Sequence, residues 1–272
     1  ELRVIKDNAV ASLKWSALIE IVSRTASPII FVILARILTP ADFGIVATAM
    51  IVISFSQVIW DAGLSMALIQ TSEEHKQAAN VVFFSNIALS VAIYVFLFMA
   101  APTVAVFFNS PASAPVLRIM GIQIILSSFT SVQRTLLVRD FDFRKLFWIK
   151  LITAFIPGVF SIPMAYYGNG VWALVAGSLA SQVINIWLLW KRSDWRPRFS
   201  YDVVLALKLF KFGSWVLLES VGAWLVVWGD NLIVGHFLGV KDLGIYRTSW
   251  MLVTIIFGLF LNPFIPVLYP TF

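Results

Sequence analysis

The sequence contains no cysteine and only two histidines, and only 12% of its 272 residues are charged. The missing cysteines exclude disulfide bonds, thiolate metal sites and cysteine-based catalysis, and two histidines are too few for a histidine-rich metal centre. We therefore expect neither a metal ion nor another cofactor. Because about a quarter of the residues of a soluble domain are charged, the low charge also excludes a water-soluble globule.

Apolar residues are abundant instead. They make up 60% of the chain, and its mean hydropathy is +0.90. They form tracts of more than about 20 residues, the length of helix that crosses a hydrocarbon layer of about 30 Å. This pattern predicts an all-α polytopic membrane protein with about eight transmembrane helices. The expected spans are 13–38, 43–69, 80–108, 116–138, 146–167, 171–191, 209–238 and 243–268.

Basic residues are concentrated at one end of the expected helices, and this asymmetry predicts the orientation in the membrane. That end carries most of the Lys and Arg residues, Lys150 included, whereas the other end has Arg36, Arg118, Lys241 and Arg247. Since Lys and Arg in short loops stay on the cytoplasmic side, we expect a cytoplasmic amino terminus and a location in the cytoplasmic (inner) membrane. The formal charge of +6 then follows from topology, and no bound nucleic acid is needed to explain it.

Two segments of the chain, ARILTPADFGIVATAM and GHFLGVKDLGIYRTSW, resemble each other. Asp242 and Gly244 of the second segment lie 200 residues after Asp42 and Gly44 of the first. Because both segments place their turn at the same end of a span, the repeat is expected to be parallel. It predicts a six-helix bundle over residues 1–195 and the first two helices of a second, incomplete bundle over 196–272. Chance likeness between two apolar segments is the alternative.

Polar residues recur at helical spacing inside the expected spans, which predicts faces that avoid lipid. An ionised group costs about 2.5–3.5 kcal/mol near the bilayer centre, so charges such as Arg24 must be paired or hydrated. A structural ion pair with Glu20, one turn before Arg24, is a competing explanation. The predicted cavity residues are Glu20, Arg24, Gln57, Gln123, Arg134, Gln182 and Asn185, and the predicted residues for ion coupling or charge balance are Asp61, Glu219 and Asp230.

The segments ARILTPADFGIVATAMIVISFSQVIWDAGLSMALIQ and GDNLIVGHFLGVKDLGIYRTSWML resemble the Wzx-type polysaccharide flippases of the multidrug/oligosaccharidyl-lipid/polysaccharide exporter superfamily. The resemblance implies two six-helix bundles that face each other across a central cavity. It also implies alternating access that moves an oligosaccharide on a polyprenyl diphosphate carrier to the outer leaflet. The implied partners are this lipid-linked oligosaccharide, membrane lipids, and polysaccharide polymerase and export machinery.

The leading hypothesis is a lipid-linked oligosaccharide flippase in which Arg24 and Arg134 attract the diphosphate, because a guanidinium can donate two hydrogen bonds to phosphate at once. Asp61, Glu219 and Asp230 would balance charge or take up protons or a cation. A cation-coupled multidrug exporter and a non-transporting membrane bundle are the alternatives. We expect no enzyme, because every outer loop is too short to carry a catalytic site.

Overall fold

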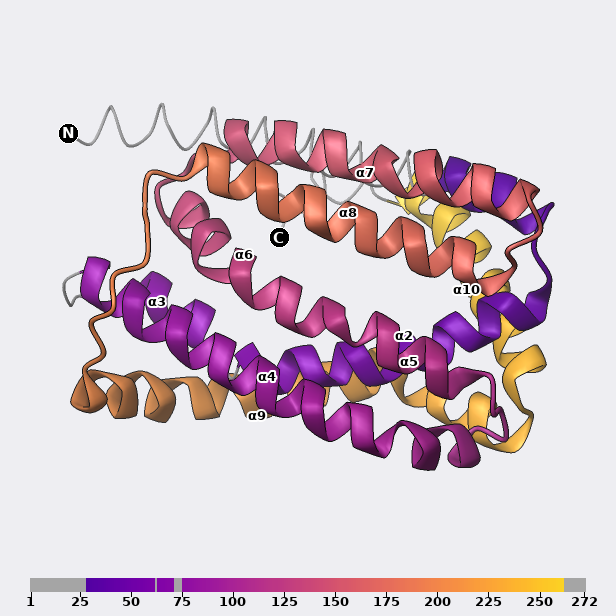
Figure 1. The fold of residues 1–272 in the computed structure, drawn as a ribbon, viewed down its shortest axis with the longest axis horizontal. Helices are drawn as coiled ribbons and strands as arrows, with labels where there is room; N and C mark the ends of the chain where they lie inside the picture. The colour runs from indigo at the N-terminus through magenta and orange to yellow at the C-terminus, as the bar shows by residue number, and fades with distance from the viewer. Residues whose placement is uncertain (1–27, 62, 71–74, 262–272) are drawn as a thin grey trace.

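The computed structural model describes residues 28–61, 63–70 and 75–261, and in these residues the chain is helical with no strand (Figure 1). This confirms the all-α prediction for the described part. A helical stretch over 28–35 comes first. The helices that follow are α2 (Pro40–Asp61), α3 (Leu64–Gln70), α4 (His75–Phe107), α5 (Ser113–Met120), α6 (Ile122–Arg139), α7 (Phe143–Tyr166), α8 (Val171–Arg192), α9 (Val203–Phe237) and α10 (Val240–Leu261).

Five of the eight expected spans are confirmed as helical segments long and apolar enough to cross a membrane. These are Pro40–Gln70, Lys76–Phe107, Ser113–Arg139, Phe143–Tyr166 and Val171–Arg192. Helices α9 and α10 lie where the seventh and eighth spans are expected but are not among these five. Most of the first expected span lies outside the described residues, so three spans stay predictions.

Two of the five spans consist of two helices each, although the sequence predicts each span as one. Helices α2 and α3 meet next to Gly63, whose φ of +70° is a conformation that favours glycine. A Cβ atom at this position would lie 2.7 Å from the carbonyl oxygen of Gly213. The break therefore bends the span and lets α9 approach its backbone. Helices α5 and α6 meet at Gly121, whose φ of −56° is an ordinary helical value.

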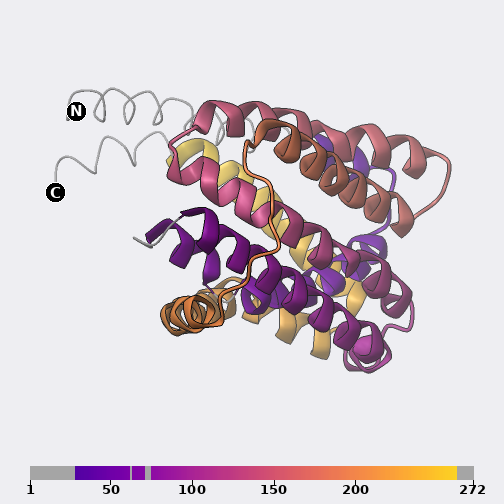
Figure 2. The same cartoon turned by 60° about the vertical axis from the view of Figure 1, so that its left-hand side comes forward.

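The helices run back and forth between two ends of the bundle, as Figure 1 shows. We call one the basic end, because the loop and helix ends over 139–145 and 191–198 carry many of the Lys and Arg residues. The other, the turn end, holds the short connections 36–39, 108–112, 167–170 and 238–239. Helices α7 and α8 lie on one side and α9 on the opposite side, with α2, α4 and α6 between them (Figures 1 and 2). Which end faces the cytoplasm stays a prediction.

Helices α2 and α10 cross closely near the turn end. A Cβ atom on Gly44 would overlap the carbonyl oxygen of Val240, and one on Gly244 would overlap the carbonyl oxygen of Pro40. The contact is thus reciprocal between positions 200 residues apart, as in an interface related by a two-fold axis. Both helices also contain 22 residues and begin at equivalent positions. The contact thus joins the two segments that resemble each other in sequence, while the parallel repeat and the division between residues 195 and 196 stay predictions.

Candidate functional site

A polar cavity lies in the half of the bundle nearer the basic end. It has two adjoining lobes of about 500 and 530 Å³, the first lined by α2, α3, α6 and α8 and the second by α6, α7 and α8. The lobes share Arg134, Val138, Gln182 and Asn185. The other polar residues that line them are Gln57, Asp61, Ser65, Ser127, Thr130, Ser131, Thr135, Lys150, Thr153 and Ser181. Each lobe is within the range of about 300–1,000 Å³ that is typical of ligand sites.

Five of the predicted site residues line this cavity. Gln57 and Asp61 lie one turn apart on α2, Arg134 lies on α6, and Gln182 and Asn185 lie three residues apart on α8. Residues three or four apart share one face of a helix, so each helix contributes a single face to the cavity wall. The structure thus brings together residues from three of the polar stripes, while the roles of these residues stay predictions.

Arg134 has an exposed side chain on the wall that the two lobes share. Among the described residues it has neither a hydrogen bond nor an ion pair, although Asp61 lines the same lobe. A guanidinium carries five N–H donors and keeps its positive charge in proteins. The side chain is therefore available to an anionic ligand that enters the cavity.

Asp61 is held by a chain of polar side chains that follows the cavity wall and ends at the buried Asn86 of α4. The Ser65 hydroxyl donates to the Asp61 carboxylate at 2.5 Å, and the hydroxyls of Ser65 and Ser131 lie 3.1 Å apart. The Asn86 side-chain amide donates to the Ser131 hydroxyl at 3.0 Å, and Asn86 is completely buried. These bonds link α2, α3, α6 and α4 and fix the carboxylate at the cavity wall.

Gln182 and Gln123 make equivalent bonds between α6 and α8. The Gln182 amide donates to the Ser127 hydroxyl at 2.9 Å, and the Gln123 amide donates to the Ser178 hydroxyl at 2.8 Å, one turn nearer the turn end. Gln182 lines the polar cavity, but Gln123 is not among the lining residues. Gln123 therefore joins two helices, and this structure does not place it at the site.

The remaining predicted residues lie elsewhere. Glu20 and Arg24 fall outside the described residues, so their pairing and their place in a cavity stay predictions. Glu219 is an exposed residue of α9 and does not line the polar cavity. Over the part of the chain that the structure describes, no group of three or more acidic or histidine side chains could hold a metal ion.

Asp230 lies in a separate polar cluster between α9 and α10. Its carboxylate accepts hydrogen bonds from the Tyr246 hydroxyl at 2.5 Å and from the Asn231 side-chain amide at 2.7 Å. Of the three acidic residues predicted to balance charge, only Asp61 lines the polar cavity.

The sequence interpretation did not assign Lys150 to the site, because it grouped this residue with the loop cations of the basic end. The side chain lies on α7 and lines the second lobe with Arg134. The available signal was its position inside the expected span 146–167.

Comparison with known proteins identifies the family of the chain. Residues 33–272 match a family model described as "Polysaccharide biosynthesis protein". The chain belongs to this family. It is 32% identical over 242 residues to the succinoglycan biosynthesis transport protein ExoT of Rhizobium meliloti, a match that covers 88% of this chain and 49% of ExoT.

Two further relatives in this family match over similar lengths. The lipopolysaccharide biosynthesis protein WzxC of Escherichia coli is 20% identical, over 98% of this chain and 55% of its own length. The teichuronic acid biosynthesis protein TuaB of Bacillus subtilis is 24% identical, over 92% of this chain and 52% of its own length. The chain therefore spans about half the length of the relatives it matches. No solved structure matches it.

The family agrees with the predicted class of protein. ExoT is named as a transport protein, and the chain is a multi-pass membrane protein of a polysaccharide biosynthesis family.

Proposed function

We propose that the whole protein flips a polyprenyl-diphosphate-linked oligosaccharide across the cytoplasmic membrane by alternating access, for polysaccharide export. The observation that carries this proposal is the convergence of Gln57, Asp61, Arg134, Gln182 and Asn185 on one cavity inside the helical bundle. Family membership supports the substrate class, because the named relatives serve succinoglycan, lipopolysaccharide and teichuronic acid biosynthesis.

Arg134 is the proposed binding residue for the diphosphate. Its guanidinium has no partner among the described residues and can donate two hydrogen bonds to phosphate oxygens. Lys150 adds a second cation to the wall of the same lobe. The neighbouring amides of Gln57, Gln182 and Asn185 both donate and accept hydrogen bonds, as recognition of sugar hydroxyls requires.

Asp61 is the proposed charge-balancing residue of the empty cavity. It shares a lobe with Arg134, and the Ser65 hydroxyl orients its carboxylate. A carboxylate opposite a guanidinium lowers the cost of an empty, positively charged cavity inside a membrane. When the diphosphate binds, Asp61 would take up a proton or a cation.

The basic end is proposed to face the cytoplasm, because Lys and Arg are retained there in short loops. The polar cavity then lies on the side from which a lipid-linked sugar is loaded. The close contact between α2 and α10 near the turn end then lies toward the outer side.

Arg134→Gln in the full-length protein, reconstituted in liposomes with a lipid-linked oligosaccharide, tests the proposal. We expect flipping to fall about tenfold or more, since a charged hydrogen bond is worth about 1.5–3 kcal/mol and 1.4 kcal/mol is a factor of ten. Arg118→Gln is the matched control, because Arg118 donates to the carbonyl oxygen of Phe98 and lies over its ring, near the turn end. Wild-type flipping by a folded Arg134→Gln variant would overturn the proposal.

A further inference from the structure

A basic pocket lies at the basic end of the bundle, where α7 begins and α8 ends (Figure 1). Its volume is about 480 Å³, and the residues that line it are Asp142, Arg144, Lys145, Trp148 and Arg192. None of these five lines the polar cavity, although Phe143, Leu146 and Lys150 of the same helix do. Helix α7 therefore turns one face to the polar cavity and another to this second site, which we call the Arg192 pocket.

The charges of the Arg192 pocket are unbalanced. Its one acidic residue, Asp142, is already paired, because its carboxylate lies 2.9 Å from the Lys145 ammonium and also accepts from the backbone N–H of Lys145. Arg192 is half-buried and has neither a hydrogen bond nor an ion pair within the described part of the chain. The two segments that meet here, 139–145 and 191–198, carry seven basic and three acidic residues. The remaining positive charge favours an anionic ligand.

Tryptophan side chains indicate the depth of this pocket in the membrane. Trp148 lies between one and two turns after the start of α7, and Trp187 lies between one and two turns before the end of α8. Both rings are exposed, and the Lys191 ammonium lies 5.0 Å from the centre of the Trp187 ring. Since Trp near the ends of transmembrane helices sits at the level of the headgroups, the Arg192 pocket lies at the depth of phospholipid headgroups.

Exposed apolar side chains continue along both helices away from the basic end. On α7 they are Ile152, Phe155 and Val159, which follow Trp148, and on α8 Val183 lies one turn from Trp187. The spacing of three or four residues keeps each stripe on one face of its helix. A ligand with an anionic head and two acyl chains matches the cations and both stripes, whereas a lipid with a single chain covers only one stripe.

We propose that the Arg192 pocket binds an anionic diacyl phospholipid, with Arg192 donating to its phosphate and Trp148 packing beside the start of its acyl chains. Basic pockets between transmembrane helices form headgroup sites of this kind. The site and the polar cavity lie on different faces of α7, so the phospholipid and a ligand in the cavity occupy separate spaces. The inference does not depend on the proposed flipping.

Native mass spectrometry of this chain in detergent, titrated with phosphatidylglycerol or with phosphatidylcholine of the same acyl chains, tests the inference. We expect the first phosphatidylglycerol to bind at least about fivefold more tightly, the effect of one basic residue beside an anionic headgroup. Arg192→Gln should remove most of this preference. Arg198→Gln is the matched control and should keep it, because Arg198 lies at the same end but outside the pocket, where its backbone N–H donates to Asn80 of α4.

Asp142→Asn provides a second variant, with an effect in the opposite direction. Asparagine still caps a helix, but Lys145 loses its carboxylate partner and becomes available to the phosphate. Phosphatidylglycerol should then bind several-fold more tightly. Asp202→Asn is the control and should change nothing, because Asp202 caps α9 in the same way and lies outside the pocket.

Equal affinity for the two phospholipids, an unchanged preference in folded Arg192→Gln, equal losses in Arg192→Gln and Arg198→Gln, or no tightening in Asp142→Asn would overturn the inference. Displacement of phosphatidylglycerol by an equal concentration of farnesyl phosphate would overturn it as well, because the pocket would then accept a lipid with one chain. The assay measures binding without transport, so its failure is distinguishable from the loss of flipping that tests the proposed function.

Discussion

The arginines of this chain differ in what surrounds their guanidinium groups. Arg118 is satisfied by the carbonyl oxygen and the ring of Phe98, and Arg196 donates to the carbonyl oxygens of Trp190, Ser193 and Trp195. Arg134 has no such partner among the described residues. We propose that a bound anion complements Arg134, whereas Arg118 and Arg196 already make contacts within the fold.

Asp61→Asn tests whether the cavity carboxylate balances the charge of Arg134. The amide oxygen still accepts from Ser65, so the fold should persist while the negative charge is lost. We expect the diphosphate ligand to bind several-fold more tightly, because repulsion between two anions is removed, and flipping to lose its dependence on an ion gradient. Equilibrium binding and liposome flipping measure the two effects.

Asp194→Asn is the matched control for this change, since Asp194 is exposed near the basic end and lies outside the cavity. If Asp61→Asn and Asp194→Asn alter binding equally, the effect is one of overall charge and the assigned role is wrong.

The spacing of polar residues along a helix predicts which of them share a face, but it does not predict all of the residues that line the cavity. Gln57 with Asp61, and Gln182 with Asn185, share a helix face by spacing alone, and each pair lines the cavity. Gln123 continues the stripe of α6 but is bonded to Ser178. Spacing shows which face of a helix a side chain occupies, but not which other side chain it hydrogen-bonds to.

At the scale of the helices, the crossing of α2 and α10 is the contact that the sequence repeat anticipates most closely. Gly44 and Gly244 are equivalent in the repeat, and each lets the partner backbone approach. The breaks inside two spans were not predicted, because apolar composition is continuous across Gly63 and Gly121. At Gly63 a positive φ accompanies the end of the helix, whereas Gly121 keeps a helical φ, so hydropathy marks neither break.

Gly44→Ala and Gly244→Ala test this crossing. Each added methyl group would overlap a backbone carbonyl oxygen that cannot rotate away. We expect each change to lower the free energy of unfolding by about 1–3 kcal/mol, the usual cost of overpacking. Denaturant unfolding in detergent micelles measures the loss.

Gly222→Ala and Gly229→Ala are the controls, because a Cβ atom at either position of α9 would meet nothing within 4 Å. An alanine inside a helix is about 0.5–1 kcal/mol more favourable than glycine, so these variants should be neutral or more stable. Equal destabilisation by all four changes would mean that α2 and α10 do not pack through their glycines.

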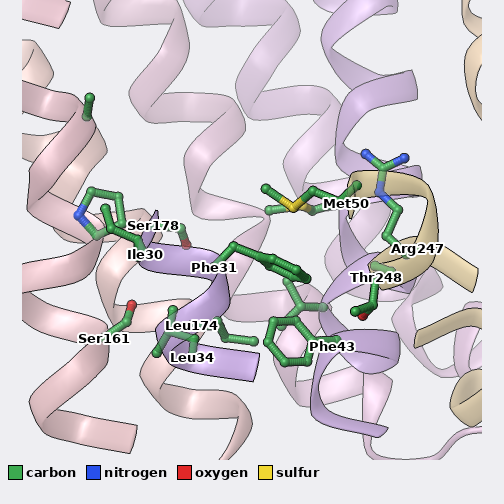
Figure 3. Close-up of a pocket in the computed structure, with 15 residues that line it drawn as sticks. Ile30, Phe31, Leu34, Phe43, Met50, Ser161, Leu174, Ser178, Arg247 and Thr248 are labelled. Atoms are coloured by element: carbon green, nitrogen blue, oxygen red, sulfur yellow. The ribbon is translucent and has the colours of Figure 1, made fainter. Parts of the chain in front are cut away.

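For the whole molecule, the sequence predicts the class of protein more completely than it predicts the cavities. Apolar tracts of sufficient length specify five of the spans directly. The apolar pocket of about 360 Å³ nearer the turn end (Figure 3) was not predicted, because five segments far apart in the chain line it and none carries a distinctive motif. Its one charged residue, Arg247, was assigned to the end of the spans opposite the basic end, and the packing of the helices places it among apolar side chains.

The central claim is that the polar cavity binds the lipid-linked substrate through Arg134. These 272 residues contain no cysteine, so Asn185→Cys introduces a single thiol on the cavity wall, with any cysteine beyond residue 272 replaced. The rate at which a maleimide labels this thiol in the full-length protein is the most direct measurement. Phe199→Cys, at a side chain that is 92% exposed near the basic end, is the control.

We predict that the lipid-linked oligosaccharide slows labelling at position 185 several-fold, leaves labelling at position 199 unchanged, and loses its effect when Arg134→Gln is added. Labelling at position 185 that proceeds at one rate with and without the substrate would contradict the claim.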